Sequence, residues 1–430
     1  MKNLFRFGLV GAMLLALVAF VHESTVKAAG GPQDAENGPY RVLAPIESGN
    51  LLLFPVVRAA GKSPGATPFI TLDEGIKSGD VEVTEAGKAR GLVRHRGSVG
   101  VPPYHDDRFR GAPDYPDENV RGDEVNTLVL VNHSDKPLLL LAGEIVTGGK
   151  QDRIIAKDRI VSANADPIDL GVFCIEPGRW TGSSSSFGAS AKMPSHSFMV
   201  QPSVRQKAMV AKDQQQVWDS VRGSISQMEM AAAPMVVPAV PSVGGNMIVG
   251  SGSVYPRTLG TTSYAQAMQD SAVSEKVDEA VAPLMKSRDQ VLAQLRQEHA
   301  VGVVVAVRGE IVWADLFADT DLLARYWTKL VRSYAAESLT EGETHSAHTV
   351  ADAQHFLNAP SGGTETSEGD VGVYRYRELS SGSTETFVLE SLLPGAEYEV
   401  HISKLKLRNA EARYPEIIRP PRRYDPQIYR

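Results

Sequence analysis

Short apolar runs separated by turn-forming residues dominate the chain from residue 40 to about residue 175. Short strands bounded by Gly, Pro, Asn and Asp are typical of β-sandwiches and barrels. The pattern therefore predicts a β-rich, sandwich-like domain over residues 40–200. Its expected strands are residues 51–57, 81–85, 91–95, 126–132, 137–141, 153–161 and 168–175.

The spacing of apolar positions becomes helical after this domain. Apolar residues from Val210 to Met228 recur on one helical face, which predicts a helix over residues 203–230. Residues 231–262 are rich in Ala, Val, Pro, Gly and Ser without any period, so we expect a flexible linker or insertion there. Helical spacing resumes at residue 263, and Pro283 is expected to divide this region into two helices.

The remaining chain mixes strands and helices. Residues 302–307 and 310–316 flank Arg308-Gly309, which predicts a tight β-hairpin, and Thr320 is the expected N-cap of the amphipathic helix that follows. The other face of this helix carries Arg325, Lys329 and Arg332, which we interpret as solvated cations. Further strands are expected at residues 371–379, 386–392 and 398–405, so residues 263–408 form an α+β domain and residues 409–430 an extended tail. The fold class is α+β.

The N-terminus has the features of a secretory signal peptide. Lys2 and Arg6 precede an apolar run over residues 7–21, and small residues near Ala29 provide a cleavage region. The run is shorter than the ~20 residues of a membrane-spanning helix, so an uncleaved anchor is the weaker alternative. We expect residues 1–29 to be removed and the protein to be exported, either to the periplasm or out of the cell, with no membrane span after signal removal.

Charge and cysteine usage restrict the class of partner. The formal net charge is −7, and loss of the signal peptide makes the chain more acidic. A net acidic chain is a poor general binder of nucleic acid, so no nucleic-acid partner is expected. Cys174 is the only cysteine, which excludes an intramolecular disulfide. Because it lies in an apolar run of an exported protein, we expect its thiol to be buried in a strand.

Two stretches concentrate charge beside glycine: LAGEIVTGGKQDR, residues 141–153, and CIEPGRW, residues 174–180. The first lacks the pattern of a nucleotide phosphate loop, because Glu144 replaces its first glycine and Gln151 its Ser or Thr. If the two turns meet at one end of the sheet, their polar side chains form a cluster. The candidate site residues are Glu144, Lys150, Gln151, Arg153, Glu176, Arg179 and Trp180.

Two interpretations of this cluster remain open. Arginines that bind carboxylate or phosphate, a stacking tryptophan and a glutamate would suit a small anionic or sugar-like ligand. The same residues would also suit an ion-pair network that fixes the corner of the domain. Residue types alone favour the network.

The two stretches together resemble the paired signature of the ARG and Rhodanese-Phosphatase-superfamily-associated protein domain family. Similarity extends over much of residues 49–339 and includes Thr71-Leu72-Asp73-Glu74, Gln216-Val217-Trp218 and Asp315-Leu316-Phe317. The resemblance names no reaction. The name of the family implies, by association only, a link to NAD or ADP-ribose metabolism. The signal peptide argues against an intracellular nucleotide role.

No other motif indicates a reaction. His345, His348, Asp352 and His355 have helical spacing, but the Gly-rich sequence around them leaves little room for a helix, so no metal site is expected. Familiar hydrolase and dinucleotide signatures are missing, and no cofactor is expected. The sequence thus predicts an exported protein that binds a small anionic or ribose-containing ligand at the cluster. The alternative is a non-catalytic structural or interaction protein of the cell envelope; whether the chain is an enzyme and which proteins it contacts stay open.

Overall fold

The computed structural model describes residues 38–58, 68–85, 126–179, 186–188, 198–232, 235–237, 253–255, 258–286, 288–339, 348–360 and 363–407. Several predicted features lie outside these residues. They are the signal peptide 1–29, the strand at 91–95, Trp180, most of the 231–262 insertion, His345 and the tail 409–430.

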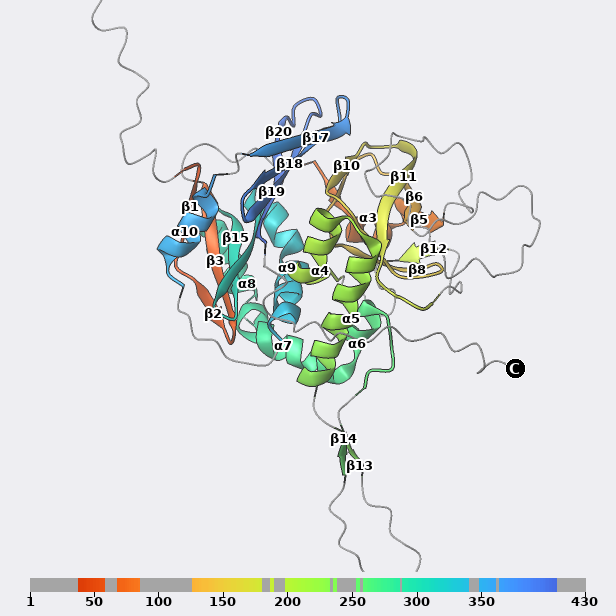
Figure 1. Cartoon of the computed structure of the whole chain (residues 1–430). Helices are drawn as coiled ribbons and strands as arrows, with labels where there is room; N and C mark the ends of the chain where they lie inside the picture. The colour runs from red at the N-terminus through yellow and green to blue at the C-terminus, as the bar shows by residue number, and fades with distance from the viewer. Residues whose placement is uncertain are drawn as a thin grey trace, which may run out of the picture.

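A nine-stranded antiparallel sheet forms one side of the molecule (Figure 1). It joins strands from both ends of the described chain, because β3 pairs with β15. In order along the sheet, the strands are β1 (Tyr40–Val42), β3 (Leu51–Arg58), β15 (Ala300–Val307), β16 (Glu310–Phe317), β20 (Tyr398–Lys406), β19 (Thr384–Ser391), β18 (Tyr374–Ser381) and β17 (Thr364–Asp370), with β2 (Ile46–Ser48) also paired to β3.

The central strands of this sheet are buried on both faces. Along β15, Val303 and Val305 belong to the main core, whereas Val304 packs into a smaller cluster on the opposite face. Alternate side chains of a strand point to opposite faces, so a continuous run of valines suits a doubly covered strand. The predicted hairpin at residues 308–309 is confirmed: Arg308 and Gly309 both have positive φ, as a tight two-residue turn requires.

Six strands close into a barrel on the other side of the molecule. Along β9, Ile155 belongs to the cluster inside the barrel and Ile154 to the main core outside it. The barrel order is β11 (Ala165–Cys174), β6 (Thr127–Asn132), β5 (Val81–Glu85), β12 (Ser186–Gly188), β8 (Ile145–Gly148) and β9 (Arg153–Ile155). A small sheet of β10 (Arg159–Val161), β7 (Leu138–Leu140) and β4 (Ile70–Thr71) accompanies it.

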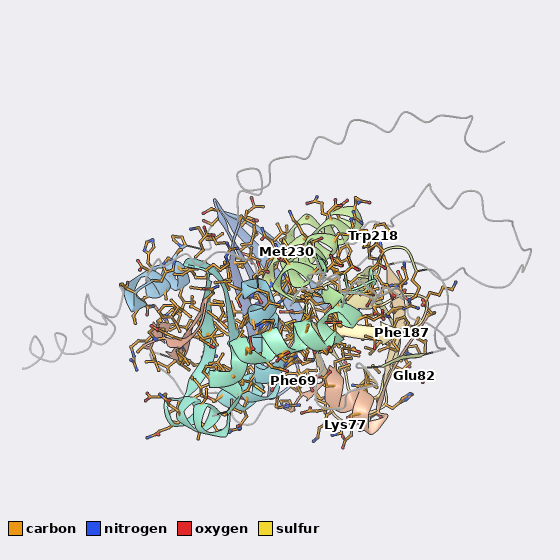
Figure 2. All side chains as sticks on the ribbon, turned by 90° about the horizontal axis from the view of Figure 1, so that it is seen from below. Phe69, Lys77, Glu82, Phe187, Trp218 and Met230 are labelled. Atoms are coloured by element: carbon orange, nitrogen blue, oxygen red, sulfur yellow. The ribbon has the colours of Figure 1, made fainter. Side chains whose placement is uncertain are left out.

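Helices occupy the space between the large sheet and the barrel, and side chains fill this space (Figures 1 and 2). Their apolar faces merge with one side of the sheet and with the outer wall of the barrel into a single core. The helices of this layer are α4 (Pro202–Gln206), α5 (Gln214–Ala231), α6 (Tyr264–Gln269), α7 (Ser271–Lys286), α8 (Arg288–Gln297) and α9 (Thr320–Ser338), with the π-helical turn η3 (Lys207–Ala211) after α4. Two helices lie outside it: α3 (Leu72–Ser78) packs against the barrel strands, and α10 (Val350–Asn358) covers the opposite face of the large sheet.

The α+β class and the β-rich first half are confirmed. The strands of residues 40–58, however, belong to the large sheet and not to the barrel, so the sheets do not divide at residue 200. Pro283 lies inside α7 and does not end it. Asp319, not Thr320, caps α9, because its side chain accepts a hydrogen bond from the Leu322 amide.

Residues 235–237 and 253–255, inside the predicted insertion, pair as the antiparallel strands β13 (Met235–Val237) and β14 (Ser253–Tyr255), away from the main body in Figure 1. Among the described residues, no helix is long and apolar enough to cross a membrane.

Candidate functional site

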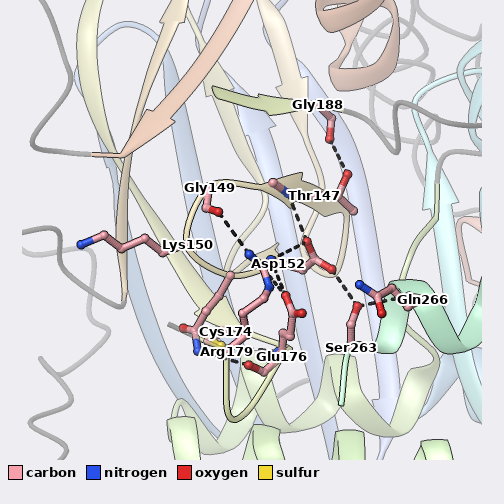
Figure 3. A network of polar contacts seen from close by, with 12 residues as sticks. Thr147, Gly149, Lys150, Asp152, Cys174, Glu176, Arg179, Gly188, Ser263 and Gln266 are labelled. Atoms are coloured by element: carbon pink, nitrogen blue, oxygen red, sulfur yellow. Dashed lines mark hydrogen bonds and ion pairs between the residues drawn. The ribbon is translucent and has the colours of Figure 1, made fainter. Parts of the chain in front are cut away.

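The two charged turns lie side by side at one end of the barrel (Figure 3). β9 pairs antiparallel with the last part of β11, and Arg153 lies opposite Cys174. The turn before β9 and the turn after β11 must therefore leave the barrel together. Gln151 Nε2 donates to the Glu176 carbonyl at 3.1 Å. Arg179 Nη1 donates to the Gly149 carbonyl at 3.3 Å.

Arg179 holds two carboxylates of these turns. Its Nη2 lies 2.5 Å from Glu176 Oε2 and 3.6 Å from Asp152 Oδ1. The Asp152 amide donates to the same Glu176 oxygen at 3.1 Å. The hydrogen bond to Glu176 raises the pKa of Arg179 above its usual value, so this guanidinium stays charged. We call Asp152, Glu176 and Arg179, together with Gln151, the two-turn cluster.

Asp152 connects the two-turn cluster to the helical layer. Its Oδ2 accepts a hydrogen bond from Ser263 Oγ at 2.7 Å, and Ser263 is the N-cap of α6. Burial raises the pKa of the Asp152 carboxyl. Neither Asp152 nor Ser263 was among the predicted site residues. Ser263 could have been found because it precedes a run with helical spacing. Asp152 could have been found because it lies between two candidate residues, Gln151 and Arg153.

Gly149 and Lys150 shape the first turn without adding a charge to the cluster. Gly149 has φ +54°, and a Cβ there would lie 2.1 Å from Phe187 Cζ, so the turn requires glycine. The Lys150 amide donates to Glu85 Oε1 at 2.8 Å. The Lys150 side chain points away from Asp152, Glu176 and Arg179 in Figure 3.

Arg153 lies deeper than the cluster, beside the single cysteine. Both side chains are fully buried. Burial lowers the pKa of Arg153 and raises the pKa of the Cys174 thiol. The backbone amide and carbonyl of Cys174 both bind the Gln214 side chain, at 2.9 and 2.8 Å, which fixes α5 to the barrel. The prediction of a buried thiol in a strand is confirmed.

Glu144 is not brought to the cluster. Its Oε1 lies 2.5 Å from Nζ of Lys329 on α9, and its Oε2 accepts a hydrogen bond from the Leu141 amide at 2.7 Å. Asp73 of α3 also contacts Lys329 Nζ, at 2.7 Å. Burial raises the pKa of Glu144. Burial alone would lower the pKa of Lys329, but Glu144 and Asp73 outweigh it and raise this pKa.

The cationic face of α9 is therefore not a solvated one. Lys329 and Arg332 are each only 3% exposed, and Arg332 forms an ion pair with Asp278 of α7. Arg325, which is more exposed, pairs with Glu74 of α3. The solvated-face interpretation is wrong for Lys329 and Arg332, since both side chains are buried and each pairs with a carboxylate from a neighbouring element.

A second buried polar network starts at Gly143. Gly143 has φ +88°, and a Cβ there would lie 2.5 Å from Cγ of Arg205 on α4. Arg205 donates two hydrogen bonds to Asp315 of β16, from Nη1 to Oδ2 at 3.0 Å and from Nη2 to Oδ1 at 3.2 Å. The guanidinium also lies over the Trp313 ring, 4.5 Å from its centroid. Bidentate pairs of this kind are strong and directional.

Asp315 is the acceptor at the centre of this network. Besides Arg205, it accepts hydrogen bonds from Ser403 Oγ at 2.7 Å and from the Tyr334 hydroxyl. His401 Nε2 lies 3.3 Å from Asp315 Oδ1, and His401 Nδ1 lies 2.6 Å from Oδ2 of Asp158. Burial alone would raise the pKa of Asp315, but Arg205 and His401 hold it well below its usual range.

We compared the chain with models of known protein families. Residues 39–405 match the model of the ARG and Rhodanese-Phosphatase-superfamily-associated Protein domain. The chain belongs to this family. Neither a search of curated proteins nor a search of solved structures found a significant match. The matched ARG and Rhodanese-Phosphatase-superfamily-associated domain covers both the barrel and the large sheet, as the shared core requires.

The stretches that carry the likeness to the ARG and Rhodanese-Phosphatase-superfamily-associated family hold the layers of this fold together. Asp73 of the TLDE stretch contacts Lys329. Asp315 of the DLF stretch binds Arg205. Thr71 and Glu74 form a capping box that begins α3 and so places Asp73.

His348, Asp352 and His355, which have helical spacing in the sequence, lie in the part of the chain that the structure describes, whereas His345 does not. No group of three or more His, Cys, Asp or Glu side chains there has the geometry to hold a metal ion. His348 Nε2 instead lies 2.7 Å from the Gly309 carbonyl, which fixes α10 to the hairpin turn.

His401 makes the stability of this domain depend on pH. Burial alone would lower its pKa, but Asp158 and Asp315 outweigh burial and raise the pKa to about 9. The folded state therefore keeps a proton that the unfolded state loses near its ordinary pKa of 6.5. The stabilisation is complete below about pH 6.5 and is lost as the pH rises toward 9.

We expect the free energy of unfolding to fall by up to about 2 kcal/mol between pH 6.5 and pH 8. Urea unfolding across this range measures it, and His401→Gln should flatten the slope. Burial lowers the pKa of Lys404 to about 8, so this lysine adds an opposite slope that begins as the pH approaches 8 and offsets part of the fall at the upper end of the range. An equal slope in His401→Gln would assign the proton to another group.

Proposed function

We propose that this protein is exported and acts as a structural or interaction protein of the cell envelope, with the two-turn cluster as an internal lock. One observation carries the proposal: the charged groups of the cluster are satisfied by each other. Arg179 contacts Glu176 and Asp152, and Asp152 also binds Ser263 of α6. Both carboxylates are buried, at 4% and 5% exposure. Ion pairs of this kind fix the position of a turn without binding a ligand.

The second candidate is binding of a small anionic or ribose-containing ligand at the same cluster. It is supported by Arg179, whose side chain is 23% exposed. A charged guanidinium at a surface is a suitable partner for a carboxylate or phosphate. Such a ligand must compete with Glu176 and Asp152 for the guanidinium, which is why the lock is the better-supported proposal.

Arg179→Ala distinguishes the two candidates. The lock predicts a loss of about 1–3 kcal/mol of unfolding free energy, because Glu176 and Asp152 lose their cation while staying buried. Arg222→Ala is the matched control, since Arg222 pairs with Asp219 on the exposed side of α5 and its loss should cost less than about 0.5 kcal/mol. Thermal unfolding of the three proteins gives the comparison.

The same proteins are then screened by thermal shift with nucleotides, sugars and phosphorylated metabolites. A ligand at one hundred times its Kd stabilises the folded state by about 2.7 kcal/mol. The lock predicts no stabilisation that depends on Arg179. A compound that stabilises the wild type and not Arg179→Ala would replace the lock with the second candidate.

A further inference from the structure

A cavity of about 350 Å³ lies between the barrel and the β17–β18 hairpin, away from the two-turn cluster. The hairpin lies next to β10, as Figure 1 shows. Lys157, Arg159 and Leu170 line the barrel side of the cavity, and Glu368, Asp370 and Tyr374 line the hairpin side. Small-molecule sites commonly occupy cavities of roughly this size, about 300–1,000 Å³, between packed units.

The wall opposite the hairpin presents two buried cations, one on β10 and one in the turn before it. Lys157 and Arg159 are 9% and 7% exposed at their side chains. Arg159 Nη1 donates to the Asp169 carbonyl at 2.9 Å, which holds the guanidinium in place. Its Nε is buried and has no hydrogen-bond acceptor among the residues that the structure describes. A buried donor without an acceptor is costly, so this wall is suited to receive an anionic group.

The hairpin wall presents carboxylates that contact these two cations. Glu368 Oε1 lies 2.7 Å from Lys157 Nζ, and Asp370 Oδ2 lies 3.6 Å from Arg159 Nη2. Lys157 also lies 3.4 Å from Glu378 Oε1 of β18. Glu368 is 39% exposed at its side chain, so its ion pair is screened by water and is weaker than a buried pair.

One more charged side chain, Asp158, lines the cavity, and a buried partner already neutralises it. Asp158 lines the cavity, but its Oδ2 binds His401 Nδ1 at 2.6 Å and its Oδ1 accepts from the Ala142 amide at 2.7 Å. The Asp158 carboxylate is therefore already paired with His401, which is itself fully buried. The cations of one wall contact the carboxylates of the other, so a ligand must exchange with both ion pairs: one is screened by water at Glu368, and the other is long, 3.6 Å, at Asp370.

We propose that this cavity binds a small zwitterion of the amino-acid class, with its carboxylate at Arg159 and Lys157 and its ammonium at Asp370 and Glu368. A guanidinium fork matches a carboxylate, and an ammonium suits two facing carboxylates. Leu170 and Tyr374 offer an apolar and aromatic surface for a side chain. A multiply charged anion such as phosphate fits less well, because Glu368 and Asp370 repel it from the opposite wall.

Calorimetric titration of the full chain with the free L-amino acids, one at a time, tests the proposal. At least one should bind. Its N-acetyl derivative, which lacks the ammonium, and its amide, which lacks the carboxylate, should each bind at least tenfold more weakly. The proposal fails if no free amino acid binds, if either derivative binds as tightly as the parent, or if inorganic phosphate binds more tightly than every amino acid.

Two variants of the same strand locate the site. Asp370→Asn should weaken binding at least tenfold, whereas Glu365→Gln should not change it, because Glu365 lies on β17 outside the cavity lining. Equal losses of affinity in the two variants would show that the amino acid does not bind in this cavity. Arg179→Ala should bind the amino acid as the wild type does, so this result is independent of the role of the two-turn cluster.

Discussion

Replacing Asp315 with Asn should lower the free energy of unfolding by about 3–5 kcal/mol. Asp315 is fully buried and accepts two hydrogen bonds from the Arg205 guanidinium. The substitution keeps the shape of the side chain but leaves Arg205 and His401 as buried cations without their shared anion. Urea unfolding at pH 7, followed by tryptophan fluorescence, measures the loss.

Asp321→Asn is the matched control for this variant. Asp321 lies on α9 and pairs with Arg296, but its side chain is 75% exposed. We expect a change within about 0.5 kcal/mol. Asp315→Asn should also lower the pKa of His401, so its stability should fall less between pH 6.5 and pH 8. A variant as stable as the control would show that the Arg205 pair contributes specificity and not stability.

The strands and helices of this chain were predictable because their apolar periods are regular. The valines of β15 and the Arg308-Gly309 turn, for example, predict a hairpin from local chemistry alone. The order of the strands was not predictable, because β3 pairs with a strand about 250 positions later along the chain. No local sequence pattern indicates that β3 pairs with β15. The pairing depends on the apolar core that the sheet and the barrel share.

The candidate site was also predictable in one part and not in another. The meeting of the two turns could be predicted, because both flank neighbouring strands of one sheet. The contact of Glu144 with Lys329 could not be predicted, since it depends on the bend at Gly143, which directs the Glu144 side chain toward α9. Lys329 was interpreted as solvated because it shares a helix face with other cations. A hydrophobic pattern records which positions are charged, but not whether a distant carboxylate pairs with them.

Lys329 is the cation that joins three elements of the fold. Its ammonium contacts Glu144 beside the barrel at 2.5 Å and Asp73 of α3 at 2.7 Å, and its own backbone belongs to α9. Glu144 is fully buried and Lys329 nearly so. Charges withdrawn from water in this way depend on each other, because neither can recover its hydration when its partner is removed.

Lys329→Met should therefore cost about 3–5 kcal/mol of unfolding free energy at pH 7, because Glu144 stays buried without its cation. Arg325→Met, on the same helix, removes the pair with the half-exposed Glu74 and should cost less than about 1 kcal/mol. Adding Glu144→Gln to Lys329→Met should recover part of the loss, since it removes the stranded charge while the amide oxygen still accepts from Leu141. Urea unfolding of the wild type and these three variants measures the loss and its recovery, and a double variant less stable than Lys329→Met would contradict the buried-pair explanation.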